Sequence, residues 1–157
     1  MKKTAVIGIG NPLRRDDAIG IILLEKLVEK KDDLPKNIKL IDGGTGGMNL
    51  LHVLSSFDKV LIVDAVDFKG SAGEFKLFKA EDVISEKTSI GFSTHETDFF
   101  KIIKMSEELG EAPDEIYIFG VQPKDVSYGQ NLSDELKQIT DSLMKNLEKE
   151  IKNLTNL

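Results

Sequence analysis

The segment Lys59–Ala65 constrains the fold more than any other part of this 157-residue chain. After its lysine it reads Val-Leu-Ile-Val, an almost unbroken apolar run. A strand with one face in water alternates apolar and polar residues, whereas a central parallel strand is covered on both faces and is apolar throughout. The run therefore predicts a central strand of a parallel sheet with helices on both of its faces.

The rest of the chain alternates between strand and helix patterns, as such a sheet requires. We expect a mostly parallel sheet of about five strands in an α/β fold, within a single domain that covers residues 1–157. Strands are predicted at Thr4–Ile9, Asn37–Asp42 and Glu115–Val121, with an alternating edge strand at Glu74–Lys79. Helices are predicted at Asp16–Glu29, Met48–Ser56, Glu96–Leu109 and Ser133–Leu154.

Composition excludes several kinds of chemistry. The chain has no cysteine and only two histidines, so zinc ribbons, iron–sulfur ligation and papain-like catalysis are excluded, and any metal site must use carboxylates. Acidic residues outnumber basic ones by 27 to 21, a net charge of −6, which disfavours binding to nucleic acid or anionic lipid. No apolar run reaches transmembrane length and no signal segment opens the chain, so we expect a cytoplasmic protein without a membrane partner.

A glycine-rich turn follows the first predicted strand, as it does in dinucleotide sites. Here the third glycine of that fingerprint is replaced by Leu13, and two carboxylates, Asp16 and Asp17, stand where phosphate needs positive potential. A nucleotide site is therefore disfavoured. The aspartates have two explanations: both can be ordinary residues of a helix start, or Asp16 caps the helix while Asp17 turns its carboxylate into the crevice at the sheet edge.

Two further residues are candidates for the same edge. Asp64 ends the central apolar run, where its carboxylate either accepts N–H bonds from the next loop or binds a metal. In a flavodoxin-like strand order, the first and third strands are neighbours, so Asp17 and Asp64 can share one crevice. His95 lies near a predicted helix start, where the dipole keeps imidazole neutral and available as a ligand, unless it is a plain surface histidine. His52 is interpreted as a packing or surface residue.

Five segments, in order across nearly the whole chain, resemble the [NiFe]-hydrogenase maturation endopeptidases. Each segment alone is weak, and the combination is specific. The segments are Gly8-x-Gly10-Asn11-x-Leu13-x-x-Asp16-Asp17-x-x-Gly20, Asp42-Gly43-Gly44-Thr45, Leu61-Ile62-Val63-Asp64-Ala65, Ser93-Thr94-His95 and Gly120-Val121-Gln122-Pro123.

The resemblance implies a fold, an activity and a site. The fold is a three-layer α/β/α sandwich around a twisted sheet, of the phosphorylase/hydrolase-like type. The activity is removal of a short C-terminal extension from the hydrogenase large-subunit precursor after nickel insertion, by an enzyme expected to be monomeric. The metal ligands fall on Asp17, Asp64 and His95, and Asp42 is functionally important. The metal is the precursor's nickel, for which zinc or cadmium could substitute in a crystal.

The sequence also limits the mechanism. No serine stands in a nucleophile-elbow context and there is no cysteine, so we expect metal-assisted attack of water, with Asp42 or Asp16 accepting the proton. In a second version the metal is only a docking point. Two other functions remain open: a general metal-dependent peptidase or amidase, and a non-catalytic nickel-binding maturation chaperone. We expect Arg14 and Arg15 to be solvated rather than to guide an acidic partner.

Overall fold

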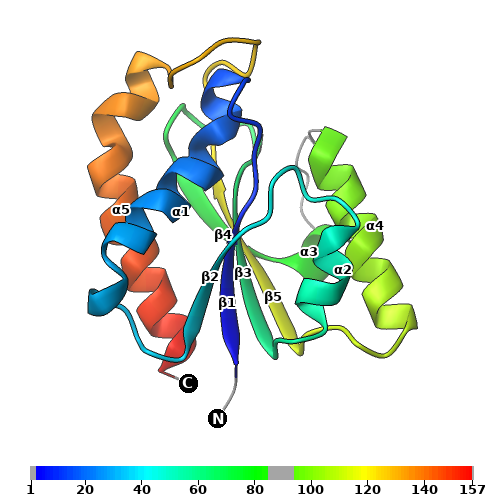
Figure 1. Cartoon of the computed structure of the whole chain (residues 1–157). Coiled ribbons are helices and arrows are strands. Elements are labelled where there is room, and N and C mark those ends of the chain that lie inside the picture. Colours follow the sequence, from blue (N-terminus) through cyan, green and yellow to red (C-terminus); the bar gives the residue numbers. More distant parts are fainter. Residues whose placement is uncertain (1–2, 85–93, 157) are drawn as a thin grey trace.

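The computed structural model describes residues 3–84 and 94–156, and the side chains among them except those of residue 84 and residues 94–98. Five strands form one sheet in the order β2-β1-β3-β5-β4 (Figure 1). Four of them run parallel, and β4 pairs antiparallel with β5 at one edge. The strands are β1 (Thr4–Gly8), β2 (Ile38–Asp42), β3 (Lys59–Ala65), β4 (Phe75–Lys79) and β5 (Glu115–Val121).

The central strand is β3, as the apolar run predicts. All seven of its residues are buried, and it lies between β1 and β5. Val63 of β3 pairs with Gly8 of β1, and Asp64 pairs with Gly120 of β5. The predicted adjacency of the first and third strands is therefore confirmed, and so is the edge position of β4.

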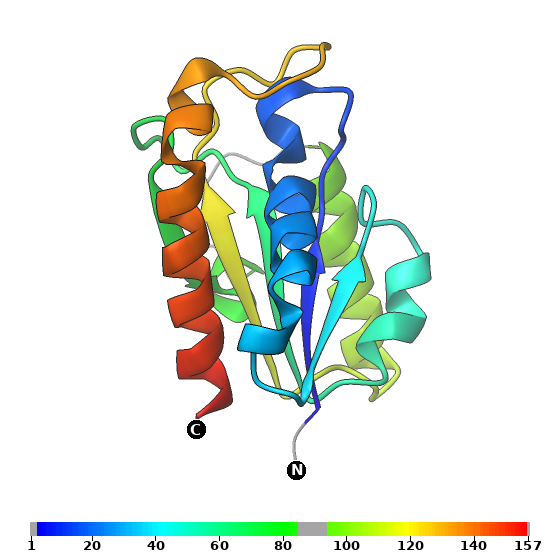
Figure 2. The same ribbon diagram turned by 60° about the vertical axis from the view of Figure 1, so that its left-hand side comes forward.

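Helices cover both faces of the sheet and complete a three-layer sandwich (Figures 1 and 2). One face packs against α1 and α5, and the other packs against α2, α3 and α4. Alternate residues of β3 divide between the two cores: Leu61 and Val63 face α1 and α5, while Val60 and Ile62 face the other side. The helices are α1 (Ile19–Glu29), α2 (Asn49–Leu54), α3 (Ala80–Ile84), α4 (Thr94–Glu108) and α5 (Asp134–Thr155).

Both ends of α5 are held by specific hydrogen bonds. At its start, Ser133 is the N-cap, and its side chain accepts a bond from the backbone N–H of Leu136. Near its end, the backbone oxygen of Leu154 accepts a 2.6 Å bond from the Nζ of Lys59, the first residue of β3. The same ammonium lies 3.3 Å from a carboxylate oxygen of Glu115. The buried Lys59 is therefore paired, as a charge with so little exposure must be.

The segment predicted as one helix over Asp16–Glu29 begins differently. A 3₁₀ turn, Arg15–Ala18, precedes α1, and neither element has a side-chain cap. The prediction that Asp16 caps its own helix is therefore wrong, because its carboxylate bonds to a distant segment described below. The sequence pattern also did not predict α3, which has only five residues. In residues 3–84 and 94–156, no helix combines the length and the apolar character needed to cross a membrane.

Candidate active site

Two buried carboxylates lie at the carboxyl ends of β1 and β3. Asp64, near the end of β3, is 3% exposed, and its Oδ1 accepts a 2.8 Å bond from the N–H of Ala65. Asp17, in the 3₁₀ turn after β1, is 1% exposed, and its Oδ2 accepts a 3.0 Å bond from the N–H of Asn11. Parallel neighbouring strands end at one edge of the sheet, so the structure brings both residues to the edge where α/β folds bind ligands.

Glycines allow the 3₁₀ turn and α1 to lie against the ends of these strands. A Cβ on Gly20 would overlap the backbone oxygens of Ile9 and Val63, and one on Gly10 would overlap the backbone oxygen of Asp17. Ile9 also donates its N–H to the oxygen of Val63 at 2.9 Å, which continues the β1–β3 pairing beyond β1. The spacing of these glycines is therefore explained by close backbone packing, with no need for a bound phosphate.

Asp42 ends β2 at the same edge and is open to solvent. It pairs with Gly8 in the β1–β2 register, and its Oδ1 accepts a 2.8 Å bond from the N–H of Gly44. The loop that follows is fastened to the end of β1 at two points: Gly43 donates to Gly8, and Gly44 accepts from Gly10, both at 2.8 Å. Three aspartates from consecutive strand ends therefore share one edge, two of them buried and one exposed.

Asp16 has a different role from its neighbour. Its side chain is fully buried, and it accepts four hydrogen bonds from the segment between β5 and α5. Oδ2 accepts bonds from the N–H groups of Lys124 and Asp125 and from the hydroxyl of Ser133, and Oδ1 accepts one from the N–H of Ser133, at 2.7–3.0 Å. These bonds favour a structural role for Asp16 over the proton-accepting role. We call this arrangement the Asp16 clasp.

The two arginines beside the clasp also contact the segment after β5, and both are half-buried, so they are partly solvated as expected. The Nε of Arg14 donates to the backbone oxygen of Val126 at 3.0 Å, and its guanidinium lies 5.9 Å from the ring centre of Tyr128. The Nε of Arg15 is 3.7 Å from a carboxylate oxygen of Asp125. The clasp and these contacts fasten the loop after β1 to the loop after β5.

His95 is the second residue of α4, so the prediction that it lies near a helix start is confirmed. Its side chain lies outside the described residues. In Figure 1, α4 begins on the upper side of the molecule, the side toward which β1 and β3 run. Among the described side chains there is no group of three metal-ligating residues. The assignment of Asp17, Asp64 and His95 as metal ligands therefore stays a prediction. His52, on α2, is exposed, which agrees with a surface residue.

Gln122, directly after β5, organises another loop of this edge. Its amide is buried: Oε1 accepts bonds from the N–H groups of Phe68 and Gly70, and Nε2 donates to Oδ1 of Asp67 at 3.1 Å. The N–H of Lys69 also donates to Asp67, and this bond, followed by that of Gln122, lowers the pKa of Asp67. From the sequence, Gln122 was noticed only as part of a motif. Its role in holding this loop could not be predicted, because its partners lie more than 50 residues earlier.

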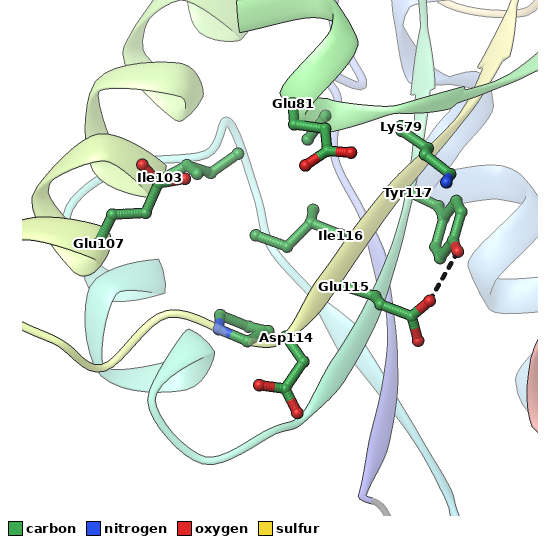
Figure 3. A pocket seen from close by; sticks show the side chains of 10 residues that line it. Lys79, Glu81, Ile103, Glu107, Asp114, Glu115, Ile116 and Tyr117 are labelled. Atoms are coloured by element: carbon green, nitrogen blue, oxygen red, sulfur yellow. Dashed lines mark hydrogen bonds between the residues drawn. The ribbon is translucent and has the colours of Figure 1, made fainter.

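A cavity of about 110 Å³ lies at the other end of the strands from the three aspartates, near the start of β5 (Figure 3). The hydroxyl of Tyr117 donates a 2.9 Å bond to a carboxylate oxygen of Glu115 there. Burial raises the pKa of Tyr117, and the bond to Glu115 raises it further. Because β5 runs parallel to β1 and β3, its start is remote from the three aspartates, and this cavity is separate from the candidate site. Its lining residues are Lys79, Ala80, Glu81, Ile103, Glu107, Pro113, Asp114, Glu115, Ile116 and Tyr117.

The fold and the site together define an α/β protein whose functional edge is rich in carboxylates and contains no thiol. The sequence model of the hydrogenase maturation protease family HycI matches residues 21–150, which include Asp42, Asp64 and His95. Because this match covers most of the chain, the chain belongs to the hydrogenase maturation protease family.

Individual relatives agree with this assignment. The hydrogenase expression/formation protein HupD of Rhodobacter capsulatus is 33% identical over 132 residues, which are 83% of this chain and 62% of that protein. A relative from Methanocaldococcus jannaschii is also 33% identical, over 93% of this chain and 86% of its own. The hydrogenase maturating endopeptidase HybD from E. coli superimposes with a TM-score of 0.82 at 25% identity, over 96% of this chain and 93% of that one. The chain spans less than two thirds of the length of the HupD relatives.

Proposed function

We propose that this protein is the endopeptidase that removes the C-terminal extension of a [NiFe]-hydrogenase large-subunit precursor after nickel insertion. One observation carries the proposal: a member of the maturation protease family holds two buried carboxylates, Asp17 and Asp64, at one sheet edge. Buried carboxylates are costly unless they are paired, hydrogen-bonded or able to bind a cation. A cationic metal presented by the substrate is a suitable ligand for such an edge.

The precursor's nickel is the proposed recognition element, and Asp17, Asp64 and His95 complete its coordination. The donor chemistry supports this choice. Carboxylate oxygen and imidazole nitrogen bind nickel, yet the chain has no cysteine, so it does not compete as a thiolate for a metal that the precursor already holds. Nickel in this position supplies a Lewis acid that polarises the scissile carbonyl.

Asp42 is the better placed of the two proposed proton acceptors. In the described structure only its Oδ1 is engaged, by Gly44, and the residue is exposed to solvent. Asp16, in contrast, is fully buried, and its carboxylate accepts the four hydrogen bonds of the clasp. A water molecule beside an exposed carboxylate can transfer its proton directly, which is the requirement for a general base. We assign this role to Asp42.

The glycine loop beside Asp42 leaves room for the substrate peptide. A Cβ added to Gly44 or Gly47 would meet no atom within 4 Å, so the space next to this loop is open. Gly44 and Gly46 also have positive φ angles of 56° and 82°, which side chains rarely adopt. A peptide backbone can therefore approach this loop closely, next to the proposed base.

The two histidines of the chain provide a matched test of the site. His95→Ala and His52→Ala are each incubated with the full-length precursor, with and without nickel, and the products are measured by mass spectrometry. We expect His52→Ala to cleave the nickel-loaded precursor like the wild type and His95→Ala to lose cleavage. Full activity of His95→Ala would refute the ligand assignment.

The same assay separates the alternatives. Wild-type cleavage of unrelated peptides without nickel would favour a general peptidase. Binding of the precursor without any cleavage would favour a maturation chaperone.

A further inference from the structure

Two loops beside the candidate site carry exposed apolar side chains. Leu13, in the loop after β1, is 62% exposed, and Tyr128, in the loop between β5 and α5, is 82% exposed. Single exposed apolar residues are common and need no explanation. These two are joined: Gly129, next to Tyr128, donates its N–H to the backbone oxygen of Leu13 at 2.8 Å. Figures 1 and 2 both show the two loops side by side at the upper end of the molecule.

The exposed pair stands on a rigid support. The Asp16 clasp fastens the two loops from beneath, and a β-bridge joins Arg14 to Gly129. The guanidinium of Arg14 lies 5.9 Å from the ring centre of Tyr128, within reach of a cation–π contact. The backbone beneath Tyr128 is thus held in the free protein while its ring faces solvent. Tyrosine has few rotatable bonds, so ordering its side chain on binding costs little conformational entropy, and aromatic side chains dominate interface energies.

We infer that Leu13, Arg14 and Tyr128 form a docking surface for the hydrogenase large-subunit precursor, which we call the docking ridge. The inference rests on the proposed function. Leu13 lies four residues before Asp17 on the same loop, so a protein seated on the ridge also covers the edge that holds the buried carboxylates. The ridge therefore orients the body of the precursor while its C-terminal extension reaches Asp42.

A second copy of this chain is a poorer occupant of the ridge. In a two-fold dimer the same patch of both copies forms the interface, which would place two Arg14 guanidinium groups in one interface. Such a dimer would also cover the edge at Asp17 and Asp64 in both copies. The precursor has neither drawback, because its surface is independent of the ridge and its nickel is the ligand proposed for that edge.

The test uses Leu13→Glu and Tyr128→Ala with Leu109→Glu as a matched control. Leu109 follows α4 at the other end of the molecule and is 60% exposed, almost the same as Leu13. Binding of the full-length, nickel-loaded precursor is measured by biolayer interferometry, and cleavage by mass spectrometry. We expect each ridge variant to raise Kd about tenfold or more, as a hot-spot residue does. KM should rise in the same proportion, with kcat nearly unchanged at saturation, and Leu109→Glu should match the wild type.

The outcomes separate this inference from the proposed function. If the wild type cleaves the precursor and both ridge variants bind it with unchanged Kd, the docking ridge is refuted and the protease function stands. If the wild type binds but does not cleave, while the ridge variants bind weakly, the ridge stands and the protease function fails. A wild type that neither binds nor cleaves refutes both. A wild-type dimer in solution that Leu13→Glu dissociates would also refute the inference, since the ridge would then join two copies.

Discussion

Replacing Asp16 by alanine removes every bond of the Asp16 clasp at once. The fully buried carboxylate accepts from Lys124, Asp125 and twice from Ser133, so four donors lose their acceptor. A hydrogen bond to a charged group contributes about 1.5–3 kcal/mol, which sets an upper limit of about 6–12 kcal/mol for four. The donors are only partly buried and can regain water, and the variant no longer buries a charge. We therefore expect a loss of about 3–5 kcal/mol, the range typical of removing one partner of a buried charged pair.

Asp16→Asn gives a graded comparison. Oδ2 accepts three of the bonds and Oδ1 accepts the fourth, so an amide nitrogen in place of either oxygen faces at least one N–H or O–H donor. This isosteric variant should lose about 1–3 kcal/mol, less than alanine. For a chain of this length the alanine loss corresponds to a decrease in Tm of about 6–20 °C.

Urea unfolding at pH 7, followed by circular dichroism, measures both variants. The control is Asp32→Ala, which changes an exposed aspartate far from the clasp. Ser133→Ala and the double variant complete a mutant cycle, and we expect strong non-additivity because the two residues share bonds. If Asp16→Ala unfolds within about 0.5 kcal/mol of the control, like an ordinary surface substitution, the clasp contributes no stability and the reasoning is wrong.

Two further predictions follow from the packing of the edge and from its pKa shifts. Gly20→Ala should destabilise the fold by about 1–3 kcal/mol, since its Cβ would overlap backbone oxygens, whereas Gly47→Ala should be close to neutral in the same urea experiment. Because the pKa of Asp67 is lowered from 3.8, its ionised form stabilises the fold above that pH, and the contribution is lost as the pH falls through the lowered value. Gln122→Ala should raise the pKa of Asp67 towards 3.8 in an NMR titration, and exposed Gln138→Ala should not; equal titrations of Asp67 in both variants would contradict the assignment.

The layout of the fold could be predicted because the relevant signals are local. The apolar run of β3 indicates burial on both faces, the alternation of β4 indicates an edge, and the apolar stripe of α5 indicates one covered face. Each property depends only on residues within one element. The strand order β2-β1-β3 then follows from the preferences of parallel α/β sheets.

The different roles of the two adjacent aspartates, Asp16 as a structural acceptor and Asp17 as a candidate ligand, could not be predicted from the sequence. Asp16 and Asp17 are chemically identical neighbours, and Asp16 differs only through donors that lie 108 to 117 residues further along the chain. No periodicity connects such positions. The same limit applies to Gln122, whose partners belong to the loop after β3. Asp64 could be predicted because it ends the apolar run of β3, and Asp17 because it stands at a predicted helix start next to that strand, whereas Asp42 was indicated only by the family resemblance. The role of His95 stays a prediction.

The two attachments of α5 have a consequence for how the protein is made. The clasp links Asp16 to Ser133 across 117 positions, and Lys59 reaches Leu154 across 95. Contacts between such distant positions close long loops, and they cannot form until both partners have been synthesised. A chain emerging from the ribosome can pair β1 with β2 and β3 early, but the Asp16 clasp is not complete until Ser133, the N-cap of α5, has been synthesised. We therefore expect the edge that carries Asp17 and Asp64 to become fully ordered only at the final stage of folding.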